Sequence, residues 1–245
     1  MVVAPPTATS SDRPEVVLIT GTRTGVGKAL AEHFLARGDQ VVGCSRRPAT
    51  IVHPAYRHHE VDVTDHRQVR SMFRAVRAEH GYLDALVNNA GVGTMNHFMT
   101  TPDDVARRVF DVNFFAVLAC SRESVKLLQR STRSPSVLNV STIAVPWALE
   151  GQLVYSASKS AVEQLTRVMS KEVADLGIRV NGIGLPPVRT VLTRTVPQEK
   201  VDALVRRQAL RRMCTMADIT GPVEFLLSRQ SSFVTGETLF LGGVH

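Results

Sequence analysis

The length and composition of the chain point to one large globular domain. Its 245 residues, 44% hydrophobic and 21% charged, suffice for an α/β domain with a well-buried core. No apolar run approaches the ~18 residues that a membrane span needs, and the start of the chain lacks the basic head and apolar core of a secretory signal. The net charge of +7 does not indicate nucleic-acid binding, because the basic residues are spread along expected helices without interleaved aromatic residues.

The three cysteines, Cys44, Cys120 and Cys214, lie far apart in the sequence. They form no CxxC pair, so they indicate neither a disulfide framework nor a zinc site. We therefore expect free thiols in a cytoplasmic protein, with no metal and with no membrane or nucleic acid as a partner.

Short apolar runs alternate with amphipathic stretches after a Pro-, Ser- and Thr-rich flexible tail over residues 1–14. Strands are expected, in chain order, at 16–20, 40–45, 58–63, 84–89, 136–141, 179–184 and 238–242. Helices are expected near 25–37, 65–80, 102–111, 113–130, 153–176, 199–210 and 216–228. The alternation predicts a single α/β domain over 15–245, with a doubly wound parallel sheet, helices on both faces and ligand sites at the carboxyl ends of the strands.

Three glycines stand where the first expected strand turns into the first helix, in "VLITGTRTGVGKAL" (17–30). Gly21 ends the strand, and Gly25 and Gly27 open a helix whose N-terminus carries unpaired N–H groups and the positive end of the helix dipole. Without Cβ atoms, such a turn allows a pyrophosphate to lie against the backbone. The spacing G-x-x-x-G-x-G is weak evidence by itself and becomes informative only with further motifs.

Further motifs follow along the chain: "DVTD" (62–65), "NNAG" (88–91), Asn113, "NVST" (139–142), "YSASK" (155–159) and a "GG" after the last strand. Together with "TGTRTGVG" (20–27), they resemble the short-chain dehydrogenase/reductase family over Val16 to Gly243. The resemblance implies a Rossmann-type fold with a seven-stranded sheet, a nicotinamide dinucleotide cofactor and a homo-oligomer, either a tetramer or a dimer.

Tyr155 and Lys159 are four residues apart in an expected helix, so both project from one face. The pKa of a free phenol, about 10, is too high for easy proton exchange at neutral pH, and a neighbouring ammonium lowers it. We therefore predict that Tyr155 is the general acid of the reaction. By the resemblance, Lys159 also holds the nicotinamide ribose, and Asn113 kinks a helix and holds a water connected to the lysine.

The hydroxyl that steadies the substrate carbonyl is assigned by counting. By the resemblance it lies 13 residues before the tyrosine, which is Thr142, and a threonine hydroxyl can donate the same hydrogen bond as a serine. Ser141 is the alternative, although in an extended segment it would point to the opposite face.

The end of the second strand favours NADP(H) as the cofactor. An NAD-specific member would carry an acid there for the ribose 2′-hydroxyl, whereas this chain has Ser45 followed by Arg46, with Arg23 in the glycine turn. Arginines offer forked donors for a 2′-phosphate. The residues expected at the NADPH or NADP⁺ site, besides Tyr155 and Lys159, are Gly21, Arg23, Thr24, Gly25, Val26, Gly27, Ser45, Arg46, Asp62, Val63, Asn89, Ala90, Gly91, Val188 and Thr190.

One stretch departs from the family pattern. In "GLPPVRT" (184–190), Leu185 and Pro186 stand where the family usually has a Pro-Gly pair, which predicts a stiffer loop. Apolar residues near this loop predict a pocket for a bulky ketone, although core packing explains them equally well. They are Met95, Phe98, Met99, Trp147, Val191, Leu192 and Val196.

The predicted function is NADPH-dependent reduction of a bulky apolar ketone, polycyclic or polyketide-type, in secondary metabolism. Two alternatives stay within the family: a 3-oxoacyl-thioester reductase and another alcohol dehydrogenase. A third is a non-catalytic NADP-sensing regulator, which has no need of the intact set Asn113, Thr142, Tyr155 and Lys159.

Overall fold

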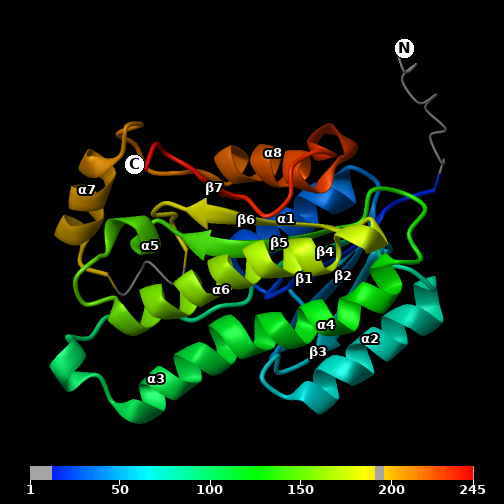
Figure 1. Cartoon of the computed structure of the whole chain (residues 1–245), viewed down its shortest axis with the longest axis horizontal. Helices are drawn as coiled ribbons and strands as arrows, with labels where there is room; N and C mark the ends of the chain where they lie inside the picture. The colour runs from blue at the N-terminus through cyan, green and yellow to red at the C-terminus, as the bar shows by residue number, and fades with distance from the viewer. Residues whose placement is uncertain (1–12, 191–195, 245) are drawn as a thin grey trace.

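The computed structural model describes residues 13–190 and 196–244. At its centre lies a parallel sheet of seven strands in the order β3-β2-β1-β4-β5-β6-β7 (Figure 1). The strands are β1 (Val16–Thr20), β2 (Gln40–Ser45), β3 (Tyr56–Glu60), β4 (Ala85–Asn88), β5 (Ser136–Thr142), β6 (Arg179–Leu185) and β7 (Thr238–Phe240). The strand order reverses between β1 and β4, and ligands of such sheets bind at this switch point.

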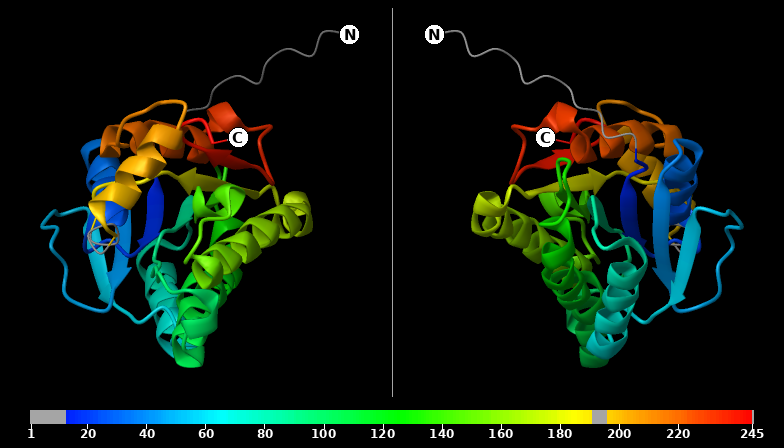
Figure 2. Two further views of the ribbon diagram at one scale, coloured as in Figure 1. Left: turned by 90° about the vertical axis from the view of Figure 1, so that its left-hand side faces the viewer. Right: turned by 90° about the vertical axis from the view of Figure 1, so that its right-hand side faces the viewer.

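Helices cover both faces of the sheet, as Figures 1 and 2 show. On one face lie α1 (Gly25–Ala36) and α8 (Met216–Leu227), and on the other lie α2 (His66–His80), α4 (Ala116–Leu128) and α6 (Leu153–Glu172). Beyond the carboxyl ends of β5 and β6 lie α5 (Ala144–Trp147) and α7 (Gln198–Arg207) (Figure 1). The remaining helical segments are α3 (Asp103–Phe110), the π-helical η2 (Asp111–Phe115) and the 3-10 turns η1 (Phe98–Thr100), η3 (Ala174–Leu176) and η5 (Arg229–Ser231).

Successive residues of β1 point to opposite faces of the sheet, as strand geometry requires. Val17 and Ile19 pack in the apolar cluster under α1 and α8, whereas Val16 and Leu18 pack in the cluster under α2 and α4. All four side chains are fully buried. The strand is therefore apolar on both faces, which explains why helices must cover both, and the predicted doubly wound fold is confirmed.

Most expected elements lie within two residues of their observed bounds. The helices expected to end at 176 and 210 end earlier, α6 at Glu172 and α7 at Arg207, and two further exceptions have local causes. β3 was expected at 58–63, but its pairing with β2 ends near Glu60, because the Asp62 side chain accepts hydrogen bonds from the Thr64 backbone and hydroxyl and turns the chain. The four-residue α5 was not predicted, and the helix expected from residue 113 begins as the π-helical η2 at Asp111.

The N-terminal tail is only partly within the described residues, because residues 1–12 lie outside them. Arg13, which was assigned to this tail, instead donates two hydrogen bonds to Asp84, at 2.8 and 2.9 Å. The described chain is therefore attached to the sheet before β1 begins.

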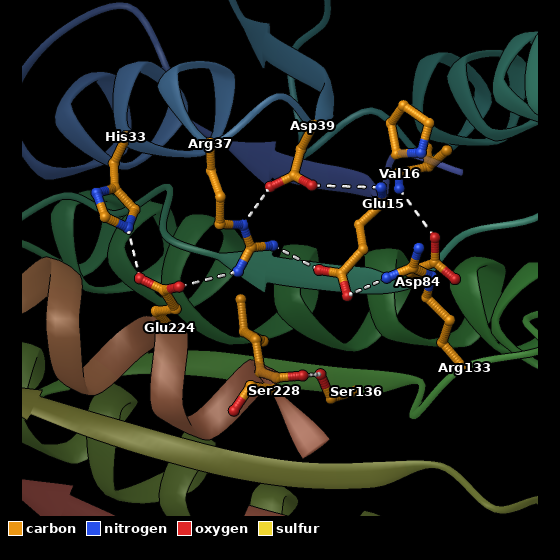
Figure 3. Close-up of polar contacts among 12 residues, drawn as sticks. Glu15, Val16, His33, Arg37, Asp39, Asp84, Arg133, Ser136, Glu224 and Ser228 are labelled. Atoms are coloured by element: carbon orange, nitrogen blue, oxygen red, sulfur yellow. Dashed lines mark hydrogen bonds and ion pairs between the residues drawn. The ribbon is translucent and has the colours of Figure 1, made fainter. Parts of the chain in front are cut away.

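An ion-pair network joins the start of β1 to α1 and α8 (Figure 3). Arg37, just after α1, bonds to Glu15 (2.5 Å), Asp39 (2.6 Å) and Glu224 of α8 (3.3 Å). His33 lies 2.9 Å from the same Glu224. Among the described helices, none is long and apolar enough to cross a membrane.

Candidate active site and cofactor groove

The carboxyl ends of β1, β2 and β4 border a groove of about 500 Å³, which we call the dinucleotide groove. Its volume is in the range of small-molecule sites. Its wall consists of Gly21, Arg23, Thr24, Gly25, Val26, Cys44, Ser45, Arg46, Val61, Asp62, Val63, Thr64, Asn89, Ala90, Gly91, Val92, Arg108, Asp111, Val112 and Thr190.

The glycine turn needs glycine for two different reasons. Gly21 (φ 78°) and Gly25 (φ 62°) have left-handed backbones that side chains disfavour. Gly27 does not line the groove; a Cβ there would fall 2.4 Å from both Gly21 O and Asn89 Nδ2. The Asn89 amide in turn donates to Thr20 O at 2.8 Å, so Gly27 and Asn89 pack the turn against the end of β1.

The N-terminus of α1 has donors to offer an anion. Its N-cap, Thr24, makes no capping hydrogen bond, and the first turn contains no acid. Arg23, on the groove wall, has a buried Nε without a hydrogen-bond partner among the described residues. Helix N-terminal N–H groups left this way favour a phosphate. The groove therefore fits a dinucleotide.

The segment after β2 is supported from β3. The Ser45 hydroxyl donates to Arg47 O (2.7 Å), and His58 Nε2 lies 3.0 Å from the same carbonyl. Because a carbonyl only accepts, Nε2 carries a proton, and Nδ1 forms a hydrogen bond with Tyr56 OH at 2.9 Å. This network holds the segment that carries Arg46 to the groove. No residue pattern in the sequence indicated these positions of His58 and Tyr56.

The end of β5 brings two hydroxyls together. Thr142 is the last residue of β5, and its hydroxyl lies close enough to the phenol of Tyr155 on α6 to lower the pKa of that phenol. Thr142 Oγ1 also accepts from Ala144 N at 3.2 Å, which leaves the threonine proton free to be donated. Lys159, one turn after Tyr155, donates to Val140 O at 2.7 Å.

Burial is the main influence on the pKa values of Tyr155 and Lys159. It raises the pKa of Tyr155, and the Thr142 hydroxyl opposes that shift. Burial also lowers the pKa of Lys159 to about 8, and the nearby carboxylate of Glu163 opposes it. We expected the ammonium to lower the phenol pKa; in the structure it bonds to the β5 backbone, and the desolvation of the phenol outweighs other effects.

Ser141 points away from Thr142. Its hydroxyl donates to Glu163 Oε1 at 2.5 Å, on the side of the sheet that α6 covers. Ser141 lines neither the dinucleotide groove nor the second cavity described below.

Asn113 lies in η2 and is fully buried. Its Oδ1 accepts from Val92 N and its Nδ2 donates to Val92 O, both at 2.9 Å, and Nδ2 also donates to Ser158 Oγ at 3.0 Å. Asn113 thus ties the loop after β4 to α6. Neither Asn113 nor Lys159 is among the described residues that line the dinucleotide groove or the second cavity described below, but a Cβ on Gly91 would lie within 3.6 Å of both.

A second cavity of about 480 Å³, which we call the substrate cavity, opens in front of Thr142 and Tyr155. Besides these two, its wall consists of Met95, Ile143, Ala144, Trp147, Ala148, Leu149, Glu150, Gln152, Leu185, Pro186, Pro187, Val196, Lys200, Val201, Ala203, Leu204 and Arg207. The segment 185–190 borders both cavities, because its first residues line this one and Thr190 lines the dinucleotide groove.

The expected pocket residues divide into three groups. Met95, Trp147 and Val196 line the substrate cavity, whereas Phe98 and Met99 are exposed and lie outside it. Val191 and Leu192 lie outside the described residues. Five residues of α7 also line the substrate cavity, and none of them was predicted individually: Lys200, Val201, Ala203, Leu204 and Arg207.

Val188 also departs from its expected place. It is buried and forms a bridge with Cys214, and it does not line the dinucleotide groove. In the described part of the chain, no group of three or more His, Cys, Asp or Glu side chains is arranged to hold a metal ion.

A doubly wound parallel sheet with a glycine turn at its switch point and a Tyr–Lys pair beside it defines a dinucleotide-binding oxidoreductase. A family model described as "Enoyl-(Acyl carrier protein) reductase" matches residues 21–245. The chain belongs to the short-chain dehydrogenase/reductase family, as its motifs predicted.

Relatives of the chain act on different substrates. It is 27% identical over 235 residues to the 3-oxoacyl-[acyl-carrier-protein] reductase FabG of Salmonella typhimurium, covering 94% of this chain and 96% of the relative. Among solved structures, it is similar to the ligand-free aldohexose dehydrogenase of Thermoplasma acidophilum (TM-score 0.87, 30% identity, covering 95% and 94%). It is also similar to a 4-hydroxyisoleucine dehydrogenase complexed with NADH (TM-score 0.83, 26% identity, covering 94% and 97%).

Proposed function

We propose that the protein reduces a bulky ketone to a secondary alcohol with NADPH as the hydride source. The observation that carries the proposal is the pair of hydroxyls, Thr142 and Tyr155, on the wall of the substrate cavity. Two proton donors side by side at the end of a parallel strand are suited to a carbonyl oxygen that gains negative charge.

The roles of the residues follow from their contacts. A bound nicotinamide supplies the hydride to the carbonyl carbon. The phenol of Tyr155 gives its proton to the carbonyl oxygen, and Thr142 donates a hydrogen bond to the same atom. The buried ammonium of Lys159 stabilises the phenolate that remains on Tyr155, because opposite charges interact strongly in a desolvated site.

One solved relative is complexed with NADH, so we do not base the choice of cofactor on the relatives. The preference for NADPH over NADH rests on this chain's own residues. The end of β2 carries Ser45 in place of an acid, and Arg23 and Arg46 line the groove. No carboxylate from β2 then repels a 2′-phosphate, and the arginines offer it donors.

The experiment is a screen of ketones with NADPH, in which reduction is monitored as the loss of NADPH absorbance. The panel includes polycyclic ketones and 3-oxoacyl thioesters, because FabG relatives are 3-oxoacyl-[acyl-carrier-protein] reductases. Tyr155→Phe is expected to abolish turnover while NADPH affinity stays within about twofold. A wild type that binds NADPH and reduces no ketone would favour the sensing alternative.

A further inference from the structure

One face of α7 forms a wall of the substrate cavity. Lys200, Ala203, Leu204 and Arg207 lie at positions i, i+3, i+4 and i+7 of the helix, and all four line the cavity. The face is apolar in its middle and cationic at both ends. At a rise of 1.5 Å per residue, the two cations are about 10 Å apart along the helix axis.

Arg207 is held in place by an aromatic ring. Its guanidinium carbon lies 4.6 Å from the centroid of the Trp147 ring. Trp147 is itself buried, in a cluster with Ile143 and Val244, so the ring is a rigid platform. Stacking uses the face of the guanidinium and leaves the N–H groups at its edge free to bind an anion.

Those N–H groups have no partner among residues 13–190 and 196–244, where no hydrogen bond or ion pair joins the Arg207 guanidinium. Lys200, at the other end of the face, contacts Met95 Sδ at 3.8 Å. Among the described residues, the charged groups on the cavity wall are Glu150, Lys200 and Arg207. One acid and two cations leave one positive charge, and no described ion pair joins Glu150 to either cation.

Arg207 is exposed, so its guanidinium is hydrated when the cavity is empty, and a substrate that fills the cavity displaces part of that water. An uncompensated cation out of water is costly, whereas a carboxylate restores the balance through two parallel hydrogen bonds. A single carboxylate matches the one excess charge better than a phosphate monoester, which carries close to two charges at neutral pH.

We propose that the substrate is an apolar oxo acid whose carboxylate binds the edge of Arg207 while its ketone lies at Thr142 and Tyr155. Its apolar body contacts Leu204 and the neighbouring apolar wall of the cavity. This inference rests on the proposed reduction of a ketone at Tyr155 and adds the chemistry of the far end of the substrate.

The test compares aryl oxo acids with their methyl esters. 4-Oxo-4-phenylbutanoate and its homologues, lengthened one methylene at a time, are titrated by calorimetry into the enzyme saturated with NADP⁺, which permits no reduction. Turnover of the same compounds with NADPH is measured separately. The variants are Arg207→Met, whose unbranched side chain still covers Trp147, and Arg206→Met, the adjacent arginine that does not line the cavity.

We expect the best acid to bind at least ~10-fold more tightly than its ester, since a hydrogen bond to a charged group contributes about 1.5–3 kcal/mol. Arg207→Met should remove this preference, and Arg206→Met should keep it, with NADPH affinity the same in all three proteins. Equal binding of every acid and its ester, or a preference that survives in Arg207→Met, overturns the inference even if the ketones are reduced. An acid bound through Arg207 but never reduced instead contradicts the proposed function.

Discussion

At the scale of single residues, three consecutive positions at the end of β5 each bind a different turn of α6. The pairs are Val140 with Lys159, Ser141 with Glu163 and Thr142 with Tyr155. Alternation along the strand separates Thr142, which faces the substrate cavity, from Ser141, which faces the helix. The hydroxyls of Ser141 and Thr142 therefore have different roles, although the two residues are neighbours in sequence.

The first prediction separates these hydroxyls. Thr142→Val removes a donor that strengthens as the carbonyl oxygen gains charge, so kcat should fall ~10²–10³-fold with NADPH affinity intact. Ser141→Ala should leave kcat within a few fold but lower the free energy of unfolding by about 1–3 kcal/mol, because the Glu163 carboxylate loses its buried donor. Steady-state kinetics and urea unfolding measure both. A larger loss of turnover in Ser141→Ala would show that Ser141 serves the carbonyl.

The second prediction concerns pH. The pKa of Lys159 is lowered to about 8 by burial and held up by Glu163. If the ammonium stabilises the phenolate of Tyr155, kcat/KM should fall as pH rises through about 8, because this ratio reports the free enzyme. Glu163→Gln removes the supporting charge while it can still accept from Ser141, so the fall should begin at a lower pH. An unchanged or upward-shifted profile would exclude Glu163 from this role.

Thr142 and Tyr155, which were predicted from sequence spacing, lie together on the wall of the substrate cavity. Tyr155 and Lys159 share a helix face by their spacing alone, and Thr142 follows by counting. Arg207 and His58 were missed because their positions depend on Trp147 and on the carbonyl of Arg47, which the fold brings from elsewhere. The raised pKa of Tyr155 was also out of reach, because burial in a cavity wall cannot be read from a motif.

At the scale of elements, the π-helical η2 links the loop after β4, which borders the dinucleotide groove, to α6. It lies between α3 and α4, and its wider turn places Asn113 where both ends of the amide reach Val92. A π-turn is uncommon and often lies at functional sites. No residue pattern in 111–115 distinguishes it from an ordinary helix, so the sequence predicted a helix of the usual kind there.

Asn113→Ala is therefore expected to act on cofactor binding as well as on folding. It leaves the part-buried amide and carbonyl of Val92 without their side-chain partner, which should lower the free energy of unfolding by about 1–3 kcal/mol. Because Gly91 and Val92 line the dinucleotide groove, NADPH affinity should also fall. Arg122→Ala, an exposed position on α4, is the control. Fluorescence titration measures the affinity for NADPH. Full affinity in a folded Asn113→Ala protein would contradict a role of Asn113 in cofactor binding.

At the scale of the whole molecule, large apolar side chains are exposed on the helical layer that covers one face of the sheet with α2, α4 and α6. Phe115 of η2 and Leu153 and Val168 of α6 are 47%, 58% and 43% exposed. Exposed apolar side chains on helices that carry catalytic groups are suited to an interface between subunits.

We propose that these helices pair two copies of the chain, as the resemblance to the family first suggested. Light scattering should then give a multiple of the 26.8 kDa chain mass. Val168→Glu should reduce that mass, because it buries a charge at the interface. Val52→Glu, at an exposed position after β2, should not. A monomeric wild type at micromolar concentration would contradict the proposal.

The last prediction follows from the way the start of the chain is attached to the sheet. Asp84, before β4, is buried and accepts hydrogen bonds from Arg13, Ser131 Oγ (2.5 Å) and Val16 N (2.9 Å). Burial by itself would raise the pKa of Asp84, but these bonds outweigh it and hold the pKa below its ordinary value. A carboxylate with a depressed pKa stabilises the fold above the unfolded-state pKa, about 4, and loses that contribution as pH falls through the folded-state pKa.

Asp84→Asn keeps the shape of the side chain and removes its charge, so the free energy of unfolding at neutral pH should fall by about 1.5–3 kcal/mol. Because protonation of Asp84 has the same effect in the wild type, the difference between the two proteins should shrink as the pH is lowered below about 4. Urea unfolding across this range measures it, with Asp175→Asn, at an exposed position, as the control. If the deficit stayed constant with pH, it would have to come from packing at Asp84 and not from its ion pair with Arg13.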